Sequence, residues 1–446
     1  MRWREFLELW STEWITAGRA APPPRPLDPE VLRDGWLGFA PATEAEVTAV
    51  ETRLGRRLPP SLRAFLLVSD GWRDVGPFIY RLAGTTELAW LRDTPDRHWI
   101  EVWEGLAGGD DDGADEDEDE DEAYEAAEAR VLARSLRLSL AGDSAVLLLD
   151  PEDVDQDGEW AGYWLTSWSG TGPERHASFA ELMHRQWRSF HALRRPAGPT
   201  RDHWDAEVER GRRAALAGGL DTALALLGEA AAFGRPRAVL LERQLRALPG
   251  GWRYQLPEAF LRRRDWPEFL AEPLFTREFL PLLVRHDREA DRRTPRPLPA
   301  LRENAPTAVR EAIAAYETAS AEPGFRLCFG PPEFDAAVHA VVGRLAAHRA
   351  ATRAARPRPE PAPRGTVLLS SVTEWVDGRW LPAPVPDLPF PPGIAERACA
   401  DLRAALPLWQ PLSPNHLAPL SLLAEPLLDE LLTPERARTL LTTPRA

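Results

Sequence analysis

Alternating aspartates form the most explicit chemical pattern in the chain. Asp153, Asp155 and Asp157 stand at every second position and lead into Gly158. Calcium-binding loops open in this way, because alternating carboxylates converge around a sharp glycine turn. The twelfth position of such a loop is a bidentate glutamate, and here it is Trp164. The flanking residues also have the period of strands, whereas the motif needs helices. The sequence therefore favours an acidic hairpin turn over a calcium site.

The residue types that other catalytic mechanisms need are missing or badly spaced. The chain has no lysine, so all 54 basic residues are arginine. This excludes a Walker phosphate loop, a Schiff-base lysine, a protein-kinase ATP lysine and an S-x-x-K serine. The 9 histidines include no pair at i and i+4, and no G-x-S-x-G elbow is present. Cys328 and Cys399 are too few for a disulfide framework or a thiolate zinc site and suit a reducing compartment. We expect no enzymatic activity, no cofactor and no metal.

Tryptophan is the residue type that points to binding. The chain holds 18 tryptophans, and in a strand predicted over 160–168 the period of two places three of them on one face. Two interpretations remain open. The rings pack in a core under helices, or they form an aromatic stripe that faces a partner, since tryptophan is favoured where binding energy concentrates. Together with a turn earlier in the chain, the candidate partner-binding residues are Asp70, Gly71, Trp72, Trp160, Trp164 and Trp168.

A dense acidic run dominates the charge of the chain. Between Asp110 and Glu122, 11 of 13 residues are acidic, against a net charge of −15 for the whole chain. Like charges at this density repel, so we expect a disordered acidic loop over 107–123. The loop is a solvated insertion, an attractant that steers a basic protein, or a loose cation binder. Direct binding of nucleic acid is disfavoured, because the acidic half of the chain would repel phosphates.

The elements that would position these residues begin with helices. Trp3, Phe6, Leu7, Trp10 and Trp14 have helical spacing and predict an amphipathic helix, which docks onto the rest of the chain or faces a partner or membrane surface. A proline-rich linker follows and completes a first segment, 1–29. Further on, Thr43 and Glu46 form a capping box, the helix ends at Gly55, and Pro59 and Pro60 open a second helix.

Beyond the acidic run the period changes to that of strands. Leu136, Leu138 and Leu140 alternate with polar residues, and 145–149 is a continuous apolar run that predicts a central strand. Asp157-Gly158 turns the chain into the next strand, and helical spacing returns from Phe179. This order of elements predicts an α+β domain over 30–195, with an antiparallel-rich sheet flanked by helices.

The remaining residues predict helices separated by prolines. We expect a helical region over 196–355, and then a region over 356–446 with a proline-rich linker, one small hairpin and the last helices. No stretch approaches the roughly 18 consecutive apolar residues of a membrane span, and Glu5, Glu8 and Glu13 interrupt what would be a signal peptide. A cytoplasmic protein without membrane contact is expected.

Five segments resemble the SUKH superfamily, which includes Smi/Knr-type fungal cell-wall regulators and many bacterial immunity proteins. Residues 44–55 (EAEVTAVETRLG), 58–66 (LPPSLRAFL) and 70–71 (DG) look like its helical opening. Residues 142–150 (GDSAVLLLD) are similar to its central strand with a trailing aspartate, and 177–182 (ASFAEL) to its closing helix. The resemblance covers about residues 30–195. The chain departs from the family at Trp72, where a second glycine is usual, and in its acidic run.

The resemblance implies an α+β domain that binds protein and does no chemistry. In bacteria such domains are typically immunity proteins that neutralise a cognate secreted toxin, often a nuclease. A chain without lysine and rich in alanine, arginine and proline suggests a high-GC bacterium, which favours this branch. We therefore expect an immunity protein with a basic secreted toxin or nuclease as its partner. The alternatives are a regulatory scaffold whose carboxy-terminal half holds a separate partner, or an unrecognised enzyme in that half.

Overall fold

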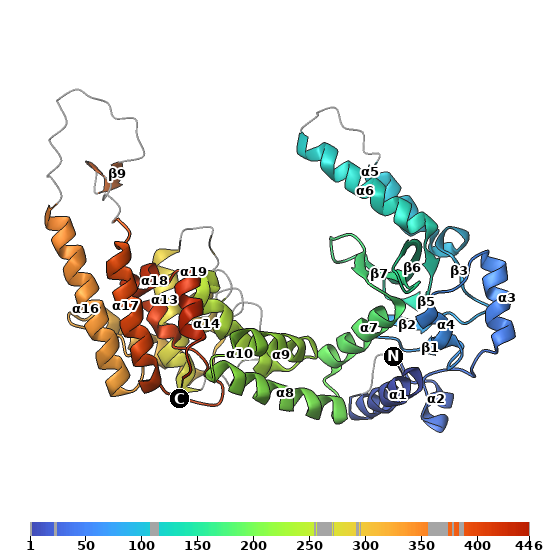
Figure 1. The fold of residues 1–446 in the computed structure, drawn as a ribbon, viewed down its shortest axis with the longest axis horizontal. Helices are drawn as coiled ribbons and strands as arrows, with labels where there is room; N and C mark the ends of the chain where they lie inside the picture. The colour runs from blue at the N-terminus through green and yellow to red at the C-terminus, as the bar shows by residue number, and fades with distance from the viewer. Residues whose placement is uncertain are drawn as a thin grey trace. The chain divides into compact units, whose positions relative to one another are not determined.

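The chain forms two compact units. The computed structural model describes residues 2–21, 25–107, 116–253, 256, 270, 272–290, 294, 296–355, 373–376, 379–382 and 388–445. The first unit comprises Met1–Asp205 with Ala231–Arg235, and the second comprises Ala206–Ala230 with Pro236–Ala446 (Figure 1). The amino-terminal helix, which the sequence analysis placed in a separate segment, lies inside the first unit.

The helices of the first unit begin and end where local signals predict. They are α1 (Trp3–Ala20), α2 (Pro29–Asp34), α3 (Glu44–Leu54), α4 (Pro60–Leu66), α5 (His98–Ala107), α6 (Glu116–Arg134) and α7 (Phe179–Arg194). The capping box is confirmed, because Thr43 Oγ1 accepts a hydrogen bond from the Glu46 N–H at 3.2 Å and the Glu46 carboxylate accepts one from the Thr43 N–H at 2.7 Å. Gly55 follows α3 with φ 69, the left-handed conformation that glycine adopts readily.

Helix α1 belongs to the core of this unit. Its residues Trp3, Leu7 and Trp10 are buried in one cluster with residues of α3, α4 and α7. The carboxylate of Glu13, buried on the same helix, accepts hydrogen bonds from the N–H and the hydroxyl of Thr200 at 3.0 and 2.9 Å. The structure therefore confirms the first interpretation of this aromatic face, in which the helix docks onto the rest of the chain.

Two antiparallel sheets lie between these helices. The five-stranded sheet has the order β3-β4-β6-β7-β8 and the three-stranded sheet the order β1-β2-β5. The strands are β1 (Trp72–Arg73), β2 (Ile79–Leu82), β3 (Ala89–Trp90), β4 (Leu136–Arg137), β5 (Ser139–Gly142), β6 (Ala145–Val154), β7 (Trp160–Thr166) and β8 (Glu174–His176). The predicted α+β class with an antiparallel-rich sheet is confirmed.

Strand β6 is central and covered on both faces, as its apolar run predicts. Leu147 and Leu149 point into the core that contains α7, whereas Val146 and Leu148 join a smaller cluster with Ile100 of α5 and Leu132 of α6. Helices thus pack on both faces of the five-stranded sheet. This explains why 145–149 lacks the alternation of a strand with one wet face.

The alternating leucines of 136–140 do not form a single strand. Leu136 belongs to β4 and pairs with β6, whereas Leu140 belongs to β5, which pairs with β2 in the other sheet. At the crossing, Leu138 donates its N–H to Leu147 O and accepts from Ala83 N–H, both at 2.8 Å. The segment therefore contributes to both sheets, and the backbone of Leu138 forms one hydrogen bond on each side.

The acidic run is helical where the structure describes it. The prediction of a loop over 107–123 is wrong for 116–123, because α6 begins at Glu116; residues 108–115 lie outside the described residues. The last turns of α6 pack through Val131, Leu132 and Ala133 in the smaller core cluster. The start of α6 therefore extends a helix that packing already stabilises, which avoids the cost of nucleation. Glutamate is a good helix former, and acidic residues in a first turn interact favourably with the helix dipole.

The described part of the second unit is mainly helical. Its helices are α8 (Pro199–Leu216) and α9 (Leu220–Ala232), which contribute to both units, α10 (Pro236–Arg246), η3 (Ala247–Gly251), η4 (Phe275–Phe279), α13 (Leu280–Glu289), α14 (Pro297–Asn304), α15 (Thr307–Ala321), α16 (Pro332–Ala355), α17 (Pro392–Ala405), η5 (Leu406–Leu408), η6 (Leu420–Ala424), α18 (Pro426–Leu431) and α19 (Pro434–Leu441). The predicted small hairpin is β9 (Thr373–Val376) paired with β10 (Arg379–Pro382). The predicted linker over 356–364 lies outside the described residues.

A buried acid and a buried histidine meet in this unit. Glu278 is 2% exposed, and its Oε2 accepts a hydrogen bond from the Ser421 N–H at 2.7 Å. His416 accepts from the Leu412 N–H at Nδ1, so its Nε2 carries the proton and donates to the Ala418 carbonyl at 2.9 Å. Burial raises the pKa of Glu278 to about 8 and lowers that of His416 to about 3. Both side chains are therefore neutral near pH 7.

The free energy of unfolding of this unit is expected to fall by about 1 kcal/mol between pH 6.5 and pH 8. In that range native Glu278 keeps a proton that the unfolded chain, with its ordinary pKa of 4.5, has released. Between pH 4.5 and 6.5 the opposite contribution of His416 cancels this slope. Urea unfolding across the pH range measures the effect. Glu278→Gln should abolish the alkaline fall, and an unchanged fall in that variant would contradict the assignment.

Candidate functional site

The first group of predicted site residues forms a corner in which Gly71 and Trp72 are buried and Asp70 is partly exposed. The Asp70 carboxylate accepts hydrogen bonds from the N–H of Thr85 at 2.6 Å and from its hydroxyl at 3.0 Å. Gly71 has φ 103, and a Cβ there would lie 3.0 Å from the Leu82 carbonyl oxygen. Trp72 is 0% exposed. The Trp72 side chain therefore stabilises the fold and offers no surface to a partner.

The aromatic stripe on β7 is also mostly core. Trp160 and Trp164 are 5% and 8% exposed and pack in the cluster that contains α7. The Arg185 guanidinium lies over the Trp164 ring, 4.6 Å from the ring centroid. The prediction that Trp72, Trp160 and Trp164 face a partner is therefore wrong, because their rings are already buried in the core. The period of two correctly placed Trp160 and Trp164 on one face, and the core interpretation is the one that holds for them.

Trp168 is the predicted residue that reaches the surface. It lies just beyond β7 in the loop to β8, and it is 50% exposed. Its ring contacts Phe78, with centroids 5.0 Å apart, and Phe78 also lies 6.4 Å from Trp164. The contacts from Trp164 through Phe78 to Trp168 thus lead from the core to the surface.

Further exposed apolar side chains lie on the helical pair α5–α6, which extends away from the sheet (Figure 1). Val102 and Leu106 on α5 are 52% and 50% exposed, and Tyr124 on α6 is 50% exposed. The ring of Tyr124 lies edge-on to that of the half-buried Trp103, with centroids 6.4 Å apart. A Cβ on Gly172 would clash with the Tyr124 hydroxyl oxygen, so the loop that carries Trp168 packs against this helical pair. We call Val102, Trp103, Leu106, Tyr124 and Trp168 the hairpin surface.

The sequence contains a signal for this surface in the spacing of the apolar residues of α5. Trp99, Val102, Trp103 and Leu106 follow the i, i+3, i+4, i+7 spacing of one helical stripe. The structure buries only part of that stripe, since Trp99 and Trp103 pack partly against the smaller core cluster whereas Val102 and Leu106 remain exposed. An amphipathic helix whose apolar face is only half covered is a candidate interface.

Negative charge borders the hairpin surface. Glu101 and Glu104 are exposed on α5, and α6 begins with the acidic residues of 116–122. Near the surface, partial burial raises the pKa of Glu128. Burial, followed by the charge of Glu128, raises the pKa of the Tyr124 hydroxyl. A surface that combines exposed apolar side chains with acidic neighbours is complementary to a basic protein.

The alternating aspartates form the hairpin turn between β6 and β7, which confirms that prediction. The Asp155 carboxylate accepts hydrogen bonds from the N–H groups of Asp157 and Glu159, both at 2.9 Å. Asp153 pairs with Arg175 at 2.6 and 2.8 Å, and this bidentate contact lowers the pKa of the Asp153 carboxyl. Within the described ranges, no group of three or more His, Cys, Asp and Glu side chains is arranged to hold a metal ion.

The second unit contains a cavity of about 520 Å³ between α13, α15 and α16. Three of its charged groups, Arg285, Arg288 and Glu289, already have partners. Arg285 pairs with Glu289 at 2.7 Å and with Asp429 at 3.0 Å, and Arg288 donates to the Ser320 hydroxyl at 2.7 Å. These contacts stabilise the packing of the helices.

The first unit therefore has the features of a protein-interaction domain: a mixed sheet-and-helix core, a partly apolar acidic surface, and conspicuous tryptophans that mostly serve the core. Residues 41–185 match the model of the SMI1 / KNR4 family (SUKH-1). This confirms the resemblance and, at family level, supports a protein-interaction or immunity-type domain of a generally non-catalytic kind. No curated protein and no solved structure matches the chain. Among the described helices, none has the length and apolar character needed to cross a membrane.

Proposed function

We propose that this chain is an immunity protein that binds and neutralises a basic toxin, and that the hairpin surface makes the contact. The observation that carries the proposal is the group of exposed apolar side chains Val102, Leu106, Tyr124 and Trp168 in a domain that matches SUKH-1. Isolated exposed apolar residues are common on protein surfaces, but several of them on one projecting element favour an interface.

Two physical terms would contribute to this binding. Burying the apolar side chains stabilises a complex by about 25 cal/mol per Å² of apolar area removed from water, and aromatic residues such as Trp168 and Tyr124 are enriched among the residues that dominate binding energy. The acidic start of α6 adds long-range attraction for a basic partner. That attraction accelerates association and weakens as salt screens the charges.

The proposal predicts that a gene for a basic toxin neighbours the gene for this chain, and the test uses the full chain with that toxin. We expect the chain to inhibit that toxin and the association rate to fall at least about tenfold from low to high salt. The double substitution Val102→Asp and Leu106→Asp should weaken binding by about a hundredfold or more, since it places charge in an apolar contact. Calorimetry measures the affinity, and the melting temperature checks that the fold persists.

A matched control places the same charges elsewhere in the unit. Leu32 and Leu193 are 47% and 59% exposed on α2 and α7, outside the hairpin surface. Leu32→Asp with Leu193→Asp should leave toxin binding unchanged. Equal losses in the two double variants, or full affinity in the Val102 and Leu106 variant, would contradict the proposed surface.

A further inference from the structure

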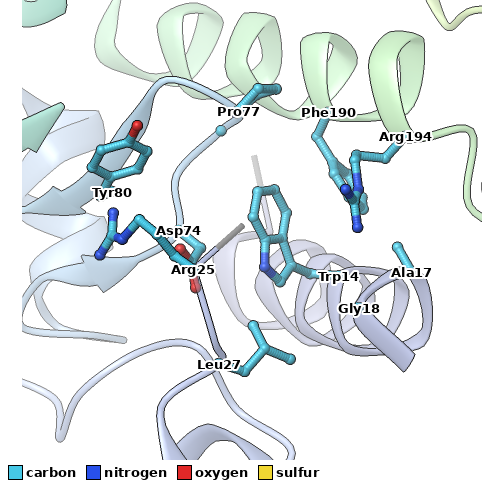
Figure 2. A pocket seen from close by; sticks show the side chains of 11 residues that line it. Trp14, Ala17, Gly18, Arg25, Leu27, Asp74, Pro77, Tyr80, Phe190 and Arg194 are labelled. Atoms are coloured by element: carbon cyan, nitrogen blue, oxygen red, sulfur yellow. The ribbon is translucent and has the colours of Figure 1, made fainter. Parts of the chain in front are cut away.

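A cavity of about 240 Å³ lies in the first unit, away from the residues of the hairpin surface. It is lined by α1, by the segment at Arg25–Leu27, by the turn from Asp74 to Tyr80, and by α7 (Figure 2). These four segments are far apart in the sequence, so the cavity exists only in the folded unit.

One side of the cavity is apolar and aromatic. The rings of Trp14 and Phe190 lie with centroids 4.5 Å apart, and Leu27 and Pro77 complete the wall (Figure 2). An apolar cavity of about 150 Å³ holds benzene. This larger cavity therefore has room for an aromatic or branched aliphatic group together with a few polar atoms.

Asp74 supplies a carboxyl group on the other side. Its backbone has φ 49 and donates its N–H to the Tyr80 carbonyl at 2.8 Å. The carboxyl group forms no hydrogen bond with any residue in the described part of the chain, and the residue is partly buried. Burial raises the pKa of Asp74 to about 6, while Arg25 and Arg73 oppose the rise and Asp28 adds to it. A partly buried carboxylate without a hydrogen-bond donor is free to pair with a cationic group of a ligand.

Two guanidinium groups line the same cavity. Arg25 lies over the ring of Tyr80, 3.9 Å from its centroid, and within the described residues it has neither a hydrogen-bond acceptor nor an ion-pair partner. Arg194 donates one hydrogen bond to the Ala21 carbonyl, which leaves further donors on its planar group. The cavity thus presents one unpaired carboxyl group and unused cationic donors beside an apolar wall.

We propose that this cavity binds a free hydrophobic amino acid, with its ammonium group on Asp74, its carboxylate on Arg25, and its side chain against Trp14 and Phe190. A ligand with only a positive charge would face two guanidinium groups, and a ligand with only a negative charge would leave Asp74 unpaired. A zwitterion pairs both, and the apolar wall selects a hydrophobic side chain. The chain would then couple a small metabolite to the stability of the amino-terminal unit.

Titration calorimetry of the full chain at pH 7.5 with L-phenylalanine and L-leucine tests the proposal. We expect saturable binding of at least one of them. N-acetyl-L-phenylalanine lacks the ammonium charge and L-phenylalanine amide lacks the carboxylate, so each should bind at least about tenfold more weakly than L-phenylalanine. Absence of binding by both amino acids at millimolar concentration would overturn the proposal, as would equal or tighter binding of the acetylated compound.

Variants separate the two charged contacts. Asp74→Asn keeps a side chain that tolerates the left-handed backbone and should weaken binding at least about tenfold, as should Arg25→Gln. Asp34→Asn and Arg33→Gln make the same changes in an exposed pair on α2 and should leave the affinity unchanged. Unaltered affinity in both cavity variants would overturn the site.

The pH dependence gives an independent readout. The charged and titratable groups around the Asp74 carboxyl group are Arg25, Asp28, Arg73, Tyr80 and Arg194. Because the ammonium contact needs ionised Asp74, the affinity should fall as the pH drops below about 6. The Asp74→Asn variant should lose this dependence. Stronger binding at pH 5 than at pH 7.5 would contradict the assignment of the ammonium group.

Discussion

Trp72→Ala is expected to lower the free energy of unfolding of the amino-terminal unit by about 3–5 kcal/mol. The ring is 0% exposed and lies between Trp10 and Trp36, with centroid distances of 6.1 and 5.0 Å. Removing it leaves a void at the junction of α1 and the three-stranded sheet, where rigid aromatic neighbours cannot collapse to fill the space. Amide hydrogen exchange of β6, measured at increasing urea concentrations, reports on the unfolding of this unit alone.

Trp168→Ala is the matched control for Trp72→Ala. The Trp168 ring is 50% exposed and its aromatic contact is with Phe78, so we expect a loss of no more than about 1 kcal/mol. The same substitution should weaken toxin binding, because Trp168 belongs to the hairpin surface. A loss below 1 kcal/mol for Trp72→Ala, or equal losses in the two variants, would contradict the division between core and surface tryptophans.

Arg134→Met is expected to destabilise the amino-terminal unit by about 3–5 kcal/mol, since it strands a buried carboxylate. Asp150 is 0% exposed at the position of the family's trailing aspartate. Its two oxygens accept hydrogen bonds from Arg134 Nε and Nη2 at 2.8 and 2.6 Å. Besides this pair, Asp150 Oδ1 accepts from the Glu152 N–H at 3.0 Å. Without the guanidinium, a charge with no access to water would remain next to the central strand.

Substitution of the other partner, Asp150→Leu, should lower the free energy of unfolding by less than Arg134→Met does. The Arg134 side chain is 33% exposed, with Glu152 3.5 Å away, so in Asp150→Leu the guanidinium can turn toward water and a second carboxylate. The double variant Arg134→Met with Asp150→Leu should recover much of the stability lost in Arg134→Met, because a hydrophobic pair often replaces a buried ion pair well. A double-mutant cycle by urea unfolding measures the coupling, and additive losses would contradict a direct interaction.

Local patterns predicted local structure well in this chain. The capping box at Thr43, the left-handed end at Gly55 and the turn at Gly158 depend on contacts between residues only a few positions apart. The family resemblance over 30–195 is confirmed for residues 41–185. In the acidic run the local pattern predicted the wrong structure over 116–123. Charge density favours a loop, but α6 continues into the run from turns that pack in the smaller core cluster.

The candidate site could be predicted only in part. The period of two placed Trp160 and Trp164 on one face of β7, but a strand pattern carries no information about which face a distant helix covers. In the structure α7 covers that face, and Trp168 reaches the surface because it follows the end of the strand. The half-covered stripe on α5 was visible in the sequence. Its exposure depended on how much of α5 the neighbouring elements bury.

The amino-acid sequence by itself determined the caps, turns and strand periods of this protein, the absence of lysine chemistry and the acidic character of one helix. Those properties follow from residue types and from interactions within a few positions of the chain. Only the tertiary structure decided which tryptophans are core and brought Trp14, Asp74 and Phe190 around one cavity. The reason is that burial and pairing depend on contacts between segments distant in sequence, and many arrangements of those segments are compatible with the same local pattern.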